Sequence, residues 1–268
     1  MSKREVYRGF TLVELSVVLV IIGLLSGAIF AGQELIKASA IRGSVSDLEK
    51  YYAAVATFRG KYTGLPGDLT RNKAVEFNLS GPADANATGD VGLRDGNTLI
   101  EGGAAGSTNL IGEVALFWQD LGSSGLIGGT YTATGTTLTT GTNVTGANAR
   151  FYLPANRLRE NASHYVYSTS GRNYFYLATI TTDAAAAVTA AGALTTLEAK
   201  SIDEKVDDGT PTTGSVLSML NLTTPDPGAP AAITACNTNT SPSVYNVSSA
   251  ATGALEAQVC QLQLRTPF

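Results

Sequence analysis

The sequence carries few charges for its length. Charged residues make up 15% of its 268 residues and the net charge is −4, whereas about a quarter of the residues are charged in an average soluble domain. No cluster of Lys and Arg stands out beyond the first nine residues, so we expect no nucleic-acid partner. Ala, Thr, Gly and Ser dominate much of the second half. Such a polar, weakly charged surface suits an exported protein that packs against copies of itself.

Histidine and cysteine are also scarce. His164 is the single histidine, and no Gly-x-Ser-x-Gly motif supplies a matched nucleophile. We therefore interpret His164 as a surface or half-buried structural residue and not as part of a hydrolase triad. Two cysteines, Cys236 and Cys260, with one distant histidine argue against a zinc site. In an exported chain the two cysteines predict a disulfide, and in a cytosolic chain they would be free thiols.

The N-terminus decides between these compartments. Residues 1–9 form a net positive stub, MSKREVYRG, and residues 10–30 form an apolar run, FTLVELSVVLVIIGLLSGAIF. As a helix this run is roughly 31 Å long, which matches a bilayer core, and the basic stub favours the cytoplasmic side. A secretory signal peptide would have a shorter apolar core followed by a small-residue cleavage site. Here the small residue, Gly9, precedes the run.

A plain signal anchor explains the length and the charges of this segment, but it does not explain Glu14. This residue lies five positions into the apolar run, where an ionised carboxylate costs several kcal/mol unless it is paired. One interpretation is that Glu14 is shallow and reaches the lipid headgroups. The other is that it pairs with a cation at the same depth, which a cut after Gly9 would create as a free α-amino group on Phe10.

The string from Arg8 to Leu15, RGFTLVEL, resembles the processing signature of type IV prepilins and of type II secretion pseudopilins. The resemblance covers about the first 30 residues. It implies that prepilin peptidase cuts between Gly9 and Phe10 and methylates the new amine. It also implies that Glu14 pairs with the Phe10 amine of a neighbouring subunit during assembly. Many pilins carry a helix-breaking proline in this stretch, and this chain has none there.

The helix is predicted to continue outward to Tyr62, because Gly64, Pro66 and Gly67 follow and end it. Apolar residues recur every three or four positions and predict one face packed on a core: Ile41, Val45, Leu48, Tyr52, Val55, Phe58 and Tyr62. The predicted organisation is a cleaved leader over 1–9, a transmembrane and assembly helix over 10–32, an amphipathic extension over 33–62, and an extracytoplasmic head over 63–268.

The head is predicted to be α+β. We expect helices over 113–126 and 194–206, with Trp118 in the core, and strands over 130–131, 150–153, 163–169, 173–182 and 258–264. Residues 128–149 read as a hairpin or a loop, and 221–250 as irregular loop. The resemblance implies a pilin-like fold, in which the long helix packs on an antiparallel sheet and a disulfide, here Cys236–Cys260, closes the C-terminal loop.

Two acidic stretches in the head are candidate metal sites. The first contains Asp203, Glu204, Asp207 and Asp208. One interpretation is a solvated helix end followed by an Asp-Asp-Gly turn. The other is a calcium site in which Asp203, Asp207 and Asp208 supply oxygen ligands. The resemblance supports the second interpretation, since several pseudopilins hold calcium in head loops. The other stretch contains Asp90, Asp95, Asn97 and Glu101, and it lacks the regular alternation of ligands in an EF-hand.

These features predict a structural, non-enzymatic subunit: a pilin, minor pilin or pseudopilin. By resemblance its partners are prepilin peptidase, other pilin or pseudopilin subunits and the bacterial inner membrane, which it crosses once before it enters a filament. The alternative is a tip adhesin or another ligand-binding minor pilin. A membrane-anchored enzyme is a third class, but no nucleophile, metal cage or acid–base pair stands out.

Overall fold

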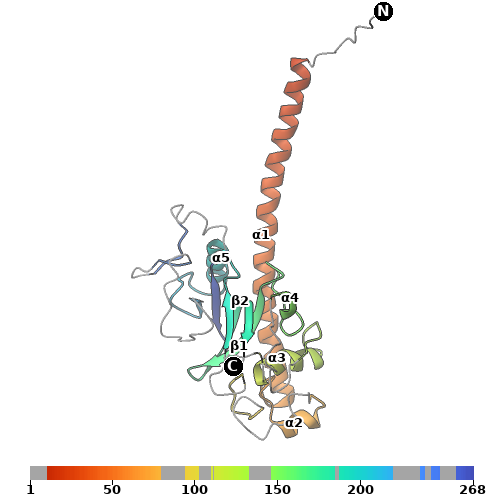
Figure 1. Ribbon diagram of the computed structural model, residues 1–268, viewed down its shortest axis with the longest axis vertical. Coiled ribbons are helices and arrows are strands. Elements are labelled where there is room, and N and C mark those ends of the chain that lie inside the picture. Colours follow the sequence, from red (N-terminus) through yellow and green to blue (C-terminus); the bar gives the residue numbers. More distant parts are fainter. Residues whose placement is uncertain are drawn as a thin grey trace, which may run out of the picture. The chain divides into compact units, whose positions relative to one another are not determined.

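The structure is a computed structural model that describes residues 11–79, 94–102, 110, 112–132, 146–184, 187–219, 236–238, 243–247 and 258–268. The chain divides into two units, Met1–Ala40 and Ile41–Phe268. One helix, α1 (Leu12–Tyr62), runs through both and ends at the predicted residue (Figure 1). In the first unit the large apolar side chains from Leu12 to Ile36 are 47% to 87% exposed.

The second unit is built on an antiparallel sheet in the order β1–β2–β5–β4, with β3 paired to β2. The strands are β1 (Ser163–Thr169), β2 (Arg172–Ala184), β3 (Ala187–Ala191), β4 (Val216–Met219) and β5 (Gln261–Arg265). A tight turn with positive φ at Ser170 and Gly171 joins β1 to β2, as expected for a short hairpin. The last strand of the chain therefore lies between β2 and β4.

The C-terminal part of α1 packs against one face of this sheet. His164 and Phe175 contact the Tyr51 ring at centroid distances of 5.2 and 6.3 Å, and Phe175 contacts Tyr52 at 5.4 Å. The seven residues predicted to form the core face of the helix all pack in the core, five of them buried and Val45 and Tyr52 partly buried. The pilin-like α+β architecture predicted from the sequence is thus confirmed.

Four short helices complete the described head: α2 (Arg71–Glu76), α3 (Gly112–Ser123), α4 (Gly146–Ala149) and α5 (Thr196–Val206). Trp118 on α3 is fully buried and contacts the Tyr51 ring edge-on at 5.0 Å. Its predicted place in the core is therefore confirmed. Thr195 and Glu198 form a capping box that starts α5, which explains why this helix begins two residues later than predicted.

Two predicted strands are wrong. Residues 150–153 form the turn that ends α4, in which the Leu153 N–H donates to the Ala149 carbonyl at 2.8 Å. Residues 130–131 are neither strand nor helix. Phe151, Tyr152 and Leu153 closely follow a helix, and residues 130–131 offer two positions, so neither window is long enough to identify a strand. Most of the predicted loop 221–250, and residues 133–145 of the Thr/Gly-rich stretch, lie outside the described residues.

Candidate functional site

The start of α1 is a capping box built from Thr11 and Glu14. The Glu14 carboxylate accepts hydrogen bonds from the Thr11 backbone N–H at 2.8 Å and from its hydroxyl at 2.9 Å. The Thr11 hydroxyl oxygen accepts from the Glu14 N–H at 3.2 Å. The spacing Thr-x-x-Glu is typical of this cap, although the cap is not among the features predicted above. The predicted processing residues, Gly9 and Phe10, lie outside the described residues.

The segment that follows the cap is long and apolar enough to span a membrane. Its mean hydropathy reaches 2.5 over 18 residues, none of which is buried within the chain. Between Glu14 and Lys37 the sequence contains one further charge, Glu34. In water, each large apolar side chain left exposed forgoes about 1.5–3 kcal/mol of burial free energy. This surface therefore requires lipid or other apolar surfaces around it.

The first acidic cluster is at the end of α5. One carboxylate oxygen each from Asp203, Asp207 and Asp208 lie within 4.8 Å of one another, so the structure brings together the three predicted calcium ligands. Asp203 is fully buried, and burial raises its pKa to about 7, although the hydrogen bond from the Tyr245 hydroxyl at 2.9 Å opposes this shift. Carboxylate oxygens are the donors that Ca²⁺ prefers.

The same three carboxylates also cap the turn after the helix. Asp208 accepts from the Thr213 hydroxyl at 2.6 Å and the Thr210 N–H at 2.8 Å, and these bonds lower its pKa. Asp207 accepts from the N–H groups of Ser215 and Val216. The structure therefore contains the Asp-Asp-Gly turn of the simpler interpretation, with the acidic side chains collected along it.

A second acidic cluster joins Asp68, Asp95 and Glu113, again with carboxylate oxygens within 4.8 Å. Asp68 accepts from the N–H groups of Gly96 and Thr98, both at 2.7 Å. Glu113 accepts from those of Asp95 at 3.2 Å and Glu101 at 3.1 Å. Two buried carboxyl groups thus hold the backbone of residues 95–101.

The sequence suggests that Asp95 groups with Asp90, Asn97 and Glu101. Asp90 lies outside the described residues, and the Asn97 amide links Asp95 to Glu101 through bonds of 2.8 and 3.2 Å. The partners Asp68 and Glu113 were missed because they are distant in sequence and no local spacing connects them to Asp95.

Burial raises the pKa of both Asp68 and Glu113, and the neighbouring carboxylates raise it further. Arg94 is the single basic residue between Lys73 and Arg150. Its side chain is buried in an ion pair with Asp120 at 2.8 Å. That stretch of chain therefore offers no second cation to the three carboxyl groups, and protonation of the cluster relieves their repulsion.

His164 is fully buried, not at the surface or half-buried as predicted. Its Nε2 lies 3.1 Å from the Asn156 amide nitrogen, which also donates to the Ser44 hydroxyl of α1 at 2.6 Å. Burial lowers the pKa of His164 to about 4, so it is neutral at pH 7. It serves as a polar contact between sheet and helix.

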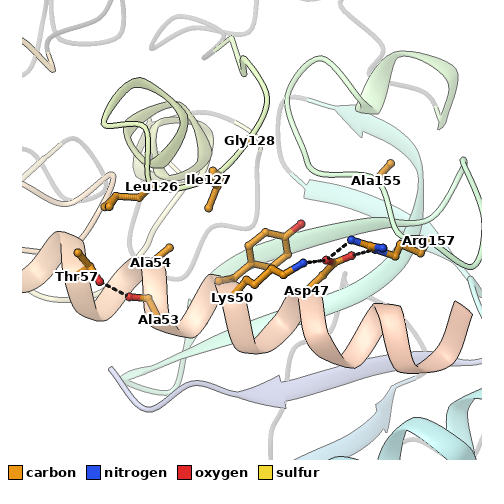
Figure 2. Close-up of a pocket in the computed structure, with 11 residues that line it drawn as sticks. Asp47, Lys50, Ala53, Ala54, Thr57, Leu126, Ile127, Gly128, Ala155 and Arg157 are labelled. Carbon is orange, nitrogen blue, oxygen red and sulfur yellow. Dashed lines mark hydrogen bonds and ion pairs between the residues drawn. The ribbon is translucent and has the colours of Figure 1, made fainter. Parts of the chain in front are cut away.

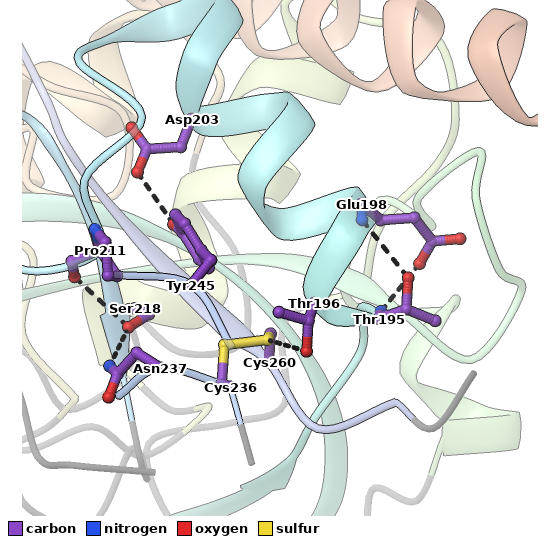
Figure 3. The surroundings of a disulfide bond; sticks show 10 residues. All are labelled: Thr195, Thr196, Glu198, Asp203, Pro211, Ser218, Cys236, Asn237, Tyr245 and Cys260. Carbon is purple, nitrogen blue, oxygen red and sulfur yellow. Dashed lines mark hydrogen bonds between the residues drawn. A yellow bond between two sulfur atoms is a disulfide. The ribbon is translucent and has the colours of Figure 1, made fainter. Parts of the chain in front are cut away.

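The predicted disulfide between Cys236 and Cys260 is present and buried. It joins the start of β5 to the described segment 236–238, beside Thr196 at the start of α5 (Figure 3). The Asn237 amide donates to the Ser218 hydroxyl of β4 at 2.7 Å, so the bridge and this bond fix one segment to two strands.

Comparison with known proteins identifies the N-terminal segment. Residues 6–30 match the family model described as the prokaryotic N-terminal methylation motif. The match contains Gly9, Phe10 and Glu14. No curated protein and no solved structure matches the chain.

Proposed function

We propose that this chain is a structural subunit of a type IV pilus or a type II secretion pseudopilus. It carries a prepilin-type N-terminal methylation motif, which is consistent with the type IV pilin and pseudopilin family. The motif implies a prepilin that is processed by prepilin peptidase. The observation that carries the proposal is the continuity of this motif with α1, whose apolar segment is unburied within the chain. Proteins of the pilin-like family are generally structural and non-enzymatic.

The apolar segment of α1 suits two successive environments. Its length and hydropathy fit an inner-membrane span before assembly. In a filament the same surface would be covered by the helices of neighbouring subunits, which replaces lipid contacts with side-chain packing. One segment can therefore anchor the precursor and later form the filament axis.

Glu14 would change partners between these states. In the described conformation its carboxylate is bound to the N–H and hydroxyl of Thr11. A cut after Gly9 would leave an α-amino group on Phe10 that a neighbouring subunit could present to Glu14 at the same depth. A carboxylate and an amine that pair inside an apolar filament offset each other's desolvation, so correct docking is favoured over a misplaced register.

The test separates pairing from capping. Glu14→Ala removes both roles, whereas Thr11→Ala removes the two capping bonds that use the Thr11 hydroxyl and keeps the carboxylate. In cells with the assembly machinery, we expect Glu14→Ala to be inserted and cleaved but absent from sheared filaments. Thr11→Ala should still assemble. Normal assembly of Glu14→Ala would rule out the pairing role.

Calcium binding by Asp203, Asp207 and Asp208 is a second proposal for the head. It is favoured by the collection of three carboxylates around one turn. Asp207 accepts both of its described hydrogen bonds at Oδ2, so its Oδ1 can face a cation, and each oxygen of Asp208 accepts one described bond and keeps a further lone pair. An ion there would also offset the repulsion from Asp208 and Asp207, which adds to the effect of burial in raising the pKa of Asp203.

The role of tip adhesin or ligand-binding minor pilin is the alternative to a shaft subunit. The two differ in stoichiometry. A shaft subunit would be the main component of purified filaments, whereas a tip or minor subunit would be present in trace amounts. Quantitative mass spectrometry of filaments distinguishes them.

A further inference from the structure

A groove of about 600 Å³ runs along the head part of α1 (Figure 2). One wall is a face of α1 from Asp47 to Thr57, and the other is formed by residues 126–128, Ala155 and Arg157. Thr57 lies ten residues after Asp47, so this wall is about 15 Å long. All of its lining residues belong to the second unit of the chain.

The groove has small residues along it and cations at one end. Ala53, Ala54 and Gly128 line it, and small side chains let another backbone approach closely. At the end near Asp47, the side chains of Lys50 and Arg157 are 61% and 56% exposed, and both bind the Asp47 carboxylate. Because Lys50 and Arg157 share the single Asp47 carboxylate, these three side chains leave a net positive charge at this end of the groove. That charge suits an acidic side chain of a binding partner.

The chain contains a segment of matching chemistry in its other unit. Glu34 is exposed and is the one charge between Glu14 and Lys37. Gly27 lies seven residues before Glu34, Ala31 lies three before it, and Ala38 lies four after it. All four residues therefore share one face of the helix. These three neighbours of Glu34 are small and uncharged, and Phe30 and Lys37 lie beside it on the adjoining flank of the helix.

Gly27, like Gly23 and Gly32, gives a further reason to expect neighbouring helices close to this part of α1. A glycine inside a helix costs about 0.5–1 kcal/mol relative to alanine. A Cβ built on Gly27 would meet nothing within 4 Å. The packing of the subunit itself therefore gives no reason for glycine, whereas close approach of a second helix does.

We propose that the Ala31–Ala38 segment of one copy packs in this groove of a second copy, with Glu34 between Lys50 and Arg157. This inference rests on the proposed filament function and specifies one contact within it. Subunits related by helical symmetry point the same way. Pairing position 34 with position 50 therefore places Ala38 of one copy beside Ala53 and Ala54 of the other.

Charge reversal tests the pairing in cells that assemble filaments from this chain. Glu34→Lys and Lys50→Glu should each reduce the yield of sheared filaments at least tenfold, and the double variant should recover most of it. Glu49→Lys is the matched control, because Glu49 is an exposed acid on the same helix that does not line the groove. Its yield should be unchanged. Immunoblots of the cut, membrane-inserted subunit confirm equal supply in each strain.

Cross-linking tests the register. Ala38→Cys with Ala53→Cys should give an oxidative ladder of dimers and higher species in purified filaments, and each single variant should not. If wild-type filaments form but the double reversal fails to recover yield, or no ladder appears, the contact is wrong and the filament function stands. If the wild type forms no filaments with the assembly machinery present, the proposed function itself fails.

Discussion

Arg157 joins a head loop to α1 by two hydrogen bonds to Asp47, from Nε at 2.6 Å and from Nη2 at 3.1 Å. The guanidinium side chain crosses the helix at Gly43, where a Cβ would come within 2.7 Å of the Arg157 Cδ. Lys50 adds a third contact to the same carboxylate at 3.3 Å. The fork geometry of arginine makes this a specific tie between segments far apart in sequence.

Arg157→Gln should lower the melting temperature of the detergent-solubilised protein by a few degrees, because Asp47 would keep Lys50 as its single described cation. Salt screens such exposed pairs, so the difference from wild type should shrink at 1 M NaCl. Arg150→Gln, at another exposed arginine, serves as control and should leave the melting temperature unchanged. A difference that is the same at low and high salt would argue against an electrostatic tie.

The cluster of Asp68, Asp95 and Glu113 predicts loss of stability in alkali. Burial raises the pKa of Asp68 and Glu113, so the folded chain keeps protons that the unfolded chain releases near pH 4. The contribution of this cluster to the free energy of unfolding is then complete at low pH and falls as pH rises from about 4 through neutrality to the raised pKa values. Glu113→Gln should flatten this fall above pH 7 in a series of melting curves. An unchanged slope in the variant would contradict the assignment.

His164 predicts the opposite trend in acid. Its folded pKa of about 4 is below the ordinary value of 6.5, so the unfolded state binds the proton first. The stabilisation is present above pH 6.5 and is lost as pH falls toward 4, by roughly 2–3 kcal/mol. His164→Leu should remove this acid limb, while Asn156 keeps its bond to Ser44. Denaturant midpoints between pH 4 and 7 measure it, and an acid limb that survives in the variant would refute the assignment.

Calcium should raise the melting temperature if the Asp203 cluster binds it. We expect an increase with 2 mM Ca²⁺, its reversal by chelator, and no increase in Asp208→Asn. Glu204→Gln is the matched control, because Glu204 lies on the same helix and pairs with Lys200 at 3.5 Å. Equal melting temperatures with calcium and with chelator would end the calcium proposal.

Much of the fold could be predicted from local sequence. The end of α1 at Tyr62 follows from the glycines and proline after it, and β1 has its predicted bounds because SHYVYST is rich in β-branched and aromatic residues. The short strand β4 was missed because four residues carry too little periodicity. The capping boxes at Thr11 and Thr195 had a readable spacing that was overlooked.

The candidate sites were less predictable because they depend on tertiary contacts. Asp203, Asp207 and Asp208 are neighbours in sequence, so their cluster was visible. Asp68 and Glu113 meet Asp95 through the folded loop, which no spacing records. The burial of His164 likewise depends on how Tyr51 and Asn156 surround it. A pattern of one polar residue among apolar ones did not separate an exposed histidine from a buried one.

The most direct measurement of the central claim is intact and N-terminal peptide mass spectrometry of the protein in a sheared filament fraction. The proposal predicts a chain that begins at Phe10 with one added methyl group on its α-amino nitrogen, present in filaments from wild-type cells and missing from those of a strain without prepilin peptidase. A filament-associated chain that keeps residues 1–9, or one whose appearance does not depend on the peptidase, would contradict it.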